Sequence, residues 1–331
     1  MKIIDPLIDE GFKLLFGREG VSEPLLMPLL NSIFAGDPVL GNIVDIQFTN
    51  TEHPNEQIFG RGLRYDISCT TSTGHHFIVE MQKGEQKHLI ERSEYYVARA
   101  IASQGFRGKN EEKESWDFSL MPVVGVFFCN FSVSGLEKEP VTYAGICNLH
   151  TGKPIGKSQC YVYIQLPNFT KDELECESQL DKWIYNIKNM GTSQRVSFKS
   201  DNDIFNYLNK VGSVAALNPM ERDRYEAALR YSRDYHAVLN TAKEKAEAEG
   251  MAKGLAKGLA KGMEKGMAQG MAQGMAQGMA QGMAQGRIEG LAEGEVAASR
   301  RIAQELLSQG MSTEMVSNIT HLSIEEVDSL R

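Results

Sequence analysis

A short stretch rich in β-branched and aromatic residues, Leu63 to Gln82, constrains the fold of this 331-residue chain more than any other. Residues 63–71 and 75–82 favour extended strands because Ile, Val, Thr, Tyr and Phe suit a pleated surface. Between them, Ser72-Thr73-Gly74 matches a three-residue hairpin loop, in which glycine commonly takes the last, left-handed position. The sequence therefore predicts a tight antiparallel hairpin.

The register of this hairpin places two carboxylates opposite each other. If Thr71 faces His75, then Asp66 faces Glu80, and both side chains lie on the same face. Directly opposed side chains have Cβ atoms roughly 5 Å apart, so the two like charges repel each other. A divalent cation removes that repulsion, and Mg²⁺ prefers one or two carboxylates together with water and phosphate oxygens. The hairpin therefore predicts a metal site at Asp66 and Glu80; the alternative is two acids that simply face solvent.

Asp66 followed by Glu80-Met81-Gln82 resembles the D…ExQ pattern of the PD-(D/E)XK nuclease superfamily, in the variant with Gln at the usual Lys position. The surrounding chain resembles the Rpn family of recombination-promoting nucleases, which are also described as transposases. The resemblance covers residues 5 to about 245 and rests on segments that occur in the family's order: Asp9–Gly17 (DxxFKxxFG), Leu29–Ile33 (LLN), Arg92–Tyr96 (RxxYY), Leu166–Phe169 (LPKF, with Asn168 in place of Lys), and Arg222–Glu226 with Arg233-Asp234.

The resemblance implies an α/β, restriction-endonuclease-like core in which helices flank a mixed sheet. It also implies a metal-dependent DNA endonuclease that hydrolyses phosphodiester bonds and is linked to recombination or mobile elements. By this resemblance Asp66 and Glu80 hold Mg²⁺ or another divalent cation, and Gln82 positions the attacking water through its amide. The catalytic residues implied are therefore Asp66, Glu80 and Gln82, with Asp9, Lys83 and Arg92 as further candidates.

Each further candidate has a plainer interpretation. Asp9 is either a third acid of the site or an acid that favours a helix N-terminus. Arg92 and Arg99 lie two turns apart on one helix face, and they contact a DNA phosphate or steady the hairpin. Lys83 points to the opposite face if the strand is regular, so it is a poor substitute for the Lys that Gln82 replaces.

Hydrophobic periodicity predicts the remaining elements. Met121–Phe131 is a continuous apolar run, which indicates a central strand buried on both faces. The other expected elements are a helix-rich start over residues 5–35, strands at Val39–Asn50, Thr142–Asn148 and Cys160–Leu166, a loop at His53–Gly62, and helices at His88–Ser103, Lys171–Met190, Asp201–Val211 and Met220–Ala248.

From Gly250 to Gly294 the composition changes, and Gly recurs every fourth residue, twelve times. Each Gly costs a helix about 1 kcal/mol relative to Ala, so an isolated helix here loses on the order of 10 kcal/mol. The repeat therefore predicts a marginal helix that needs a partner, with homo-oligomerisation as the expected means, or else an extensible linker. A four-residue period exceeds the 3.6 residues of an ideal turn and favours right-handed supercoiling.

These features divide the chain into four parts. Residues 1–170 form the nuclease-like core, 171–248 a helical subdomain, 249–296 the tetrapeptide repeat and 297–331 a small helical module. In the last part Ser312 and Ser323 are expected N-caps. That module serves either as a helix-turn-helix for DNA recognition or as a packing and self-association element.

Charge and composition limit the kinds of partner that the chain is expected to bind. Residues 1–190 carry 18 Lys and Arg against 25 Asp and Glu, whereas nucleic-acid binders usually show a basic excess. Contacts to DNA are therefore expected to rely on local clusters and bound metal. The same deficit supports an alternative function, in which a weak or inactive nuclease fold acts as an interaction module.

Targeting signals are not found in the sequence. Five cysteines without a CxxC pair indicate neither a zinc site nor a disulfide framework. The N-terminus does not resemble a signal peptide, and no apolar run reaches the roughly 18 residues of a membrane span. We therefore expect a cytoplasmic protein.

Overall fold

The computed structural model describes residues 2–37, 40–53, 63–105, 119–199 and 203–331. The chain forms two compact units, residues 1–238 and 239–331. The predicted loop at His53–Gly62 lies outside the described residues except for His53.

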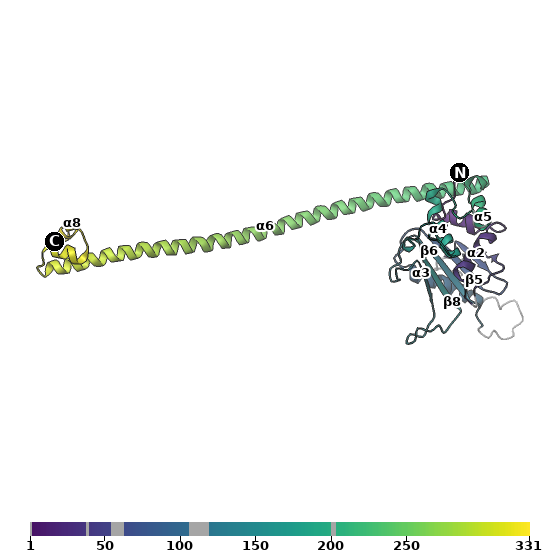
Figure 1. Ribbon diagram of the computed structural model, residues 1–331, viewed down its shortest axis with the longest axis horizontal. Helices are drawn as coiled ribbons and strands as arrows, with labels where there is room; N and C mark the ends of the chain where they lie inside the picture. The colour runs from purple at the N-terminus through teal and green to yellow at the C-terminus, as the bar shows by residue number, and fades with distance from the viewer. Residues whose placement is uncertain (1, 38–39, 54–62, 106–118, 200–202) are drawn as a thin grey trace, which may run out of the picture. The chain divides into compact units, whose positions relative to one another are not determined.

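The first unit is built on a six-stranded sheet in the order β1-β4-β5-β6-β8-β7 (Figure 1). β5, β6 and β8 run parallel to one another, while β1, β4 and β5 pair antiparallel at one side and β7 pairs antiparallel with β8 at the other. The predicted mixed sheet is confirmed. Its strands are β1 (Gln47–Phe48), β4 (Ile67–Thr70), β5 (His76–Gln82), β6 (Val123–Cys129), β7 (Val141–Gly145) and β8 (Gln159–Gln165), and β2 (Glu52–His53) pairs separately with β3 (Leu63–Arg64).

The predicted hairpin and its register are confirmed over β4 and β5, but the first strand, expected from residue 63, begins only at Ile67, because Leu63–Arg64 pairs with β2 instead. Ile67 pairs with Val79 and Thr70 with His76, a register in which Asp66 faces Glu80. The backbone N–H of Thr71 donates to the carbonyl of His75, and Gly74 has a φ of 86°, in the left-handed region where a Cβ is disfavoured. The loop therefore fixes which side chains share a face of the sheet.

Helices cover both faces of the sheet (Figure 1). On one face, α1, α2, α4 and α5 pack against Phe77, Val79 and Val126; on the other, α3 packs against Ile78 and Phe127. β6 lies between β5 and β8, and all seven of its residues are buried, which confirms the predicted central strand. The helices are α1 (Asp9–Phe16), α2 (Glu23–Ile33), α3 (Leu89–Gln104), α4 (Gln179–Ser193), α5 (Asp203–Val211) and α6 (Pro219–Ser308), with short 3₁₀ turns at Leu166–Asn168 and Val214–Ala216.

Among the described residues 40–50, the strand expected at Val39–Asn50 forms only at Gln47–Phe48, and the rest of the prediction is wrong. The side-chain amide of Asn31, in α2, accepts from the backbone N–H groups of Asn42 and Ile43 and donates to the carbonyl of Ile43. These bonds occupy the backbone groups that a strand ladder would use, and Asn42 takes a positive φ of 92°. The segment is therefore held by a side chain rather than by a neighbouring strand.

The helix expected at Lys171–Met190 begins later, at Gln179. Ser178 accepts from the backbone N–H of Asp181, and the Asp181 side chain accepts from the Ser178 N–H, which forms a capping box. This cap sets the start of α4. The helix expected at His88–Ser103 is confirmed as α3.

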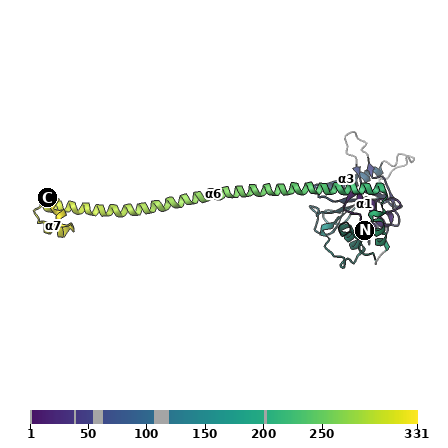
Figure 2. The same ribbon diagram turned by 90° about the horizontal axis from the view of Figure 1, so that it is seen from above.

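In the second unit, residues 239–308 of α6 form one uninterrupted helix through the Gly-rich repeat (Figure 2). α7 (Thr313–Thr320) and α8 (Ile324–Asp328) fold back beside the end of this helix, around a small core of Ala303, Val316, Leu322 and Val327. Ser312 and Ser323 are N-caps, as predicted. Among the described residues, no helix has both the length and the apolar character needed to cross a membrane.

We predict that residues 1–248 fold without the rest of the chain. Both hydrophobic clusters that contain sheet residues lie within residues 1–238, and the second unit has a core of its own. A truncation after Ala248 should give a soluble protein whose cooperative melting transition lies within a few degrees of that of the first unit in the full chain. Circular dichroism and calorimetry measure this, and loss of cooperative melting would contradict it.

Candidate active site

Two carboxylates meet where β4 begins and β5 ends. The backbone N–H of Asp66 donates to Oε1 of Glu80 (3.0 Å), and the N–H of Met81 donates to Oδ2 of Asp66 (2.9 Å). Each carboxylate is therefore bound to the backbone of the opposite strand. The structure brings the carboxylates of Asp66 and Glu80 together, with Glu80 hydrogen-bonded to Gln82 and Asp66 within reach of Lys13 on α1.

Both acids are withdrawn from solvent. The Glu80 side chain is 1% exposed and that of Asp66 is 12% exposed. Burial raises the pKa of Asp66 to about 7, together with the hydrogen bond and charge of Asp9. Burial and the charge of Asp66 raise the pKa of Glu80 to about 8. The chain thus keeps two acids where their charged forms are unfavourable, a pattern that marks functional sites.

A cation from α1 joins this pair. Nζ of Lys13 lies 3.1 Å from Oδ1 of Asp66 and 2.9 Å from the carboxylate of Asp9. Burial opposes the charged form of Lys13, but the charges of Asp66 and Asp9 raise its pKa. Burial likewise opposes ionised Asp9, but hydrogen bonds from Asp66 and Lys13 lower its pKa. Asp9, Lys13 and Asp66 therefore form one ionic group at the edge of the hairpin.

A directed chain of hydrogen bonds ends on Glu80. Arg92 donates through Nη1 to Oε1 of Gln86 (2.7 Å), Gln86 donates through Nε2 to Oε1 of Gln82 (2.6 Å), and Gln82 donates through Nε2 to Oε2 of Glu80 (3.0 Å). Arg92 also donates to the hydroxyl of Tyr96 (2.8 Å), and its Nη2 lies 4.0 Å from Oε2 of Glu80. These hydrogen bonds fix the orientation of the Gln82 amide. They also hold Arg92 in a position from which Arg92 steadies the hairpin.

A family model of PD-(D/E)XK nuclease family transposases matches residues 6–242. This chain belongs to the PD-(D/E)XK nuclease family transposases. The match confirms the resemblance seen in the sequence. Membership implies a hydrolase that acts on nucleic acids, and enzymes of this kind typically use divalent metal ions. A comparison with curated proteins and a comparison with solved structures each found no match.

For a nuclease of this family, the donor set fits a divalent cation. Carboxylate oxygens are the hard ligands that Mg²⁺ prefers, and the raised pKa values of Asp66 and Glu80 show how poorly their negative charge is compensated. Among the described residues, no group of three or more His, Cys, Asp and Glu side chains is arranged to hold a metal. The chain itself therefore offers two carboxylates, and water and phosphate would complete the coordination.

Of the three further candidates, Asp9 hydrogen-bonds to Asp66 and Arg92 lies 4.0 Å from Glu80, whereas Lys83 is bound elsewhere. Lys83, which directly follows β5, donates from Nζ to Oγ of Ser232 on α6 (2.6 Å). The contacts of Lys13 and Gln86 were not predicted from the sequence. Lys13 had a usable signal, because it follows Asp9 by four residues on a helix and closes the DxxFK motif.

Other family motifs have structural roles in this nuclease. The hydroxyl of Tyr225 accepts from the backbone N–H of Asp5 (2.8 Å), and Arg224 pairs with Glu10 (3.2 Å). Leu166 and Phe169 are buried in the main core. These residues hold the N-terminal segment, and with it α1, against the rest of the first unit.

We predict that the metal-free protein loses stability as pH rises from 5 to 8.5. Asp66 and Glu80 have folded-state pKa values of about 7 and about 8, above the value of about 4 for free carboxyls. The folded state therefore binds more protons between these limits, and the stability that this confers is lost as pH rises through 7 and 8. Melting temperature across this range measures the effect.

Variants in which an amide replaces each acid test the predicted pH dependence of the melting temperature. Asp66→Asn or Glu80→Gln should flatten the fall in melting temperature, because the neutral side chain cannot ionise. Glu91→Gln, at an exposed acid of α3, should leave the slope unchanged. An unaltered slope in both site variants would contradict the assigned pKa shifts.

Proposed function

We propose that this chain is a divalent-metal-dependent endonuclease that hydrolyses phosphodiester bonds within DNA, in recombination or at mobile elements. One observation supports this most directly: Asp66 and Glu80 are opposed, buried and held by backbone donors, although their charges repel each other. A stability argument would not retain such a pair, whereas a cation site requires it. Family membership supplies the nucleic-acid substrate.

In this proposal Asp66 and Glu80 hold Mg²⁺ or another divalent cation. An ion held by Asp66 and Glu80 would polarise a phosphoryl oxygen and lower the pKa of a water at the site. Gln82 uses one amide hydrogen on Glu80, and because the amide group carries two, the second is left for a water. Gln86 and Arg92 act as positioning residues, because they fix which end of the Gln82 amide faces Glu80.

We assign to Lys13 the positive charge that Gln82 cannot supply. Its ammonium group already lies within contact distance of Asp66, whereas that of Lys83 is bound to Ser232. A cation beside the carboxylates stabilises the charge that develops on a phosphate during hydrolysis. The first helix thus compensates for the Lys-to-Gln departure from the superfamily pattern.

The alternative is a weak or inactive nuclease fold that acts as an assembly module. The acidic balance of residues 1–190 and the Gln at the Lys position favour it. The two functions differ in one outcome, which is metal-dependent cleavage of DNA by the purified protein.

We expect the purified protein to nick supercoiled plasmid in the presence of Mg²⁺. Asp66→Asn and Glu80→Gln should each lower the rate at least about a hundredfold, because each removes a metal ligand. Both should also abolish the rise in melting temperature on addition of Mg²⁺. Glu91→Gln is the matched control, an acid-to-amide change on an exposed side chain. Equal cleavage by Asp66→Asn and the parent would refute the assigned site.

Lys13→Met should lower the rate roughly tenfold to a hundredfold, while Lys83→Met should not. In Lys13→Met the Mg²⁺ concentration that half-saturates the thermal shift should fall, because a competing cation has left Asp66. A merely structural lysine would not give tighter Mg²⁺ binding together with slower cleavage. Lys13→Arg, which keeps the charge, should restore part of the rate.

A further inference from the structure

The helix of the second unit exposes a long series of apolar side chains. Each residue of the series follows the previous one by four positions, and each is at least 55% exposed. A soluble chain seldom exposes so much apolar surface unless that surface binds something. The series consists of Met251, Leu255, Leu259, Met263, Met267, Met271, Met275, Met279 and Met283.

A second series with the same spacing carries charge in an ordered way. It begins with Lys253, Lys257, Lys261 and Lys265, continues through five Gln residues from 269 to 285, and ends with Glu289 and Glu293. Residues 266–286 contain no charged side chain. From residue 253 to residue 293, this series is therefore basic at its start, neutral in the middle and acidic at its end.

We propose that a second copy of this chain docks on this helix in antiparallel orientation, with the twofold axis at Met275. Lys257 then faces Glu293 of the second copy, and Lys261 faces Glu289 of the second copy. The twofold axis repeats both pairs, so that four ion pairs flank a neutral, Met-rich centre. Met271 faces Met279 of the second copy.

Charge complementarity selects this arrangement over its neighbours. A parallel, in-register pair would set Lys against Lys and Glu against Glu. An antiparallel pair shifted by four residues would set Arg301 against Lys253 in one direction and against Lys245 in the other. In the centred register Arg301 instead faces Glu249, and Glu305 faces Lys245.

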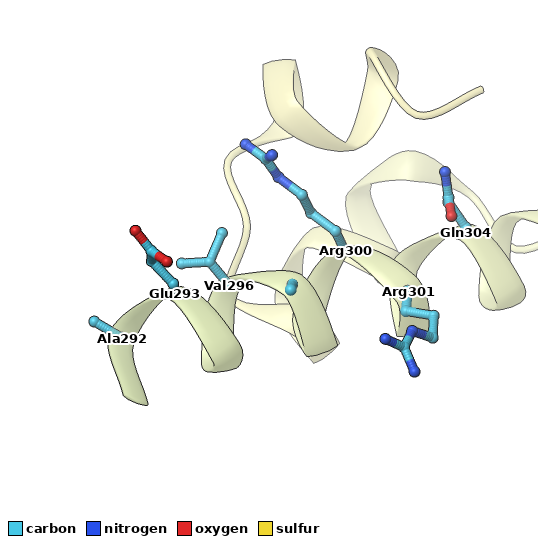
Figure 3. A pocket seen from close by; sticks show the side chains of 7 residues that line it. Ala292, Glu293, Val296, Arg300, Arg301 and Gln304 are labelled. Carbon is cyan, nitrogen blue, oxygen red and sulfur yellow. The ribbon is translucent and has the colours of Figure 1, made fainter. Parts of the chain in front are cut away.

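Helix geometry limits how far the pairing extends. Lys257 and Glu293 are separated by 36 residues, about ten turns, so they lie on one face of a straight helix with Met275 midway. A series spaced by four drifts about 40° per step, and Figure 3 shows the side chains of Glu293 and Arg301 leaving the helix on different sides. The pairs of Lys257 with Glu293 and of Lys261 with Glu289 therefore form between straight helices. The pairs farther from Met275, which involve Arg301 and Glu305, require the two helices to wrap around each other with a right-handed twist.

The glycines agree with a close partner. At every Gly from 250 to 294, an added Cβ would meet no other atom within 4 Å. Packing within the chain therefore does not require them, although each one disfavours the helix. Backbone approach of a second helix accounts for both the glycines and the exposed Met side chains.

Sedimentation of the full chain over a concentration series tests the proposal. The parent should dimerise, and the double variants Lys257→Glu/Lys261→Glu and Glu289→Lys/Glu293→Lys should each raise the dissociation constant at least about tenfold. An equimolar mixture of the two variants, or all four changes in one chain, should restore the parent value. A parent that stays monomeric, or a restored pairing that never appears, would overturn the proposal.

Orientation is tested by zero-length carbodiimide coupling, which joins Lys to Glu, on a mixture of ¹⁴N and ¹⁵N protein. Mixed-isotope links of Lys257 to Glu293 and of Lys261 to Glu289 are expected. Links between copies that join only α7 and α8 would overturn the proposal. Neither measurement uses DNA cleavage, so the outcome is independent of the proposed nuclease activity.

Discussion

The repulsion between Asp66 and Glu80 is the constraint to which the surrounding residues respond. Two carboxylates this buried keep their charge only with compensation, and the chain compensates from three directions. The backbone N–H groups of Asp66 and Met81 donate across the hairpin to the carboxylates of Glu80 and Asp66, respectively. The ammonium group of Lys13 on α1 contacts Asp66, and the amide of Gln82 on β5 donates to Glu80. Their raised pKa values show that this compensation is incomplete, and the deficit is what a divalent cation would meet.

The sheet explains how residues so distant in sequence converge. Odd residues of β5 face α1, and even residues face α3, so Glu80 and Gln82 lie on the α3 side with Arg92. Asp66 precedes the first residue of β4, at the end of the strand, where Lys13 reaches it from the other layer. The site therefore lies at the ends of the strands, where side chains from the helices on both faces of the sheet reach it. That position gives the carboxylates a rigid support.

Much of this arrangement could be predicted from sequence, because it depends on local rules. The hairpin register followed from a loop length and one glycine, and the central strand from a continuous apolar run. Predictions failed where a distant side chain decides the local structure, as Asn31 does for residues 42–43. The contacts of Lys13 were missed for the same reason: no periodicity encodes which strand end a helix will meet. Ser178 starts α4 through a capping box with Asp181, so the mostly charged residues 171–177 lie outside the helix.

Residues 1–190 carry an excess of acids, so no broad positive field draws this unit to DNA, and each contact has to be local. Two linked units bind DNA more tightly than one unit alone. Once the first unit is bound, the link holds the second at a high effective concentration near the DNA. An antiparallel helix pair that joins two chains supplies such a link. Adding or removing a unit of four residues in the middle of the repeat would change the length of this link and keep the Lys-to-Glu order at its two ends. A nuclease with weak individual contacts would thus act on DNA mainly where two copies can bind together.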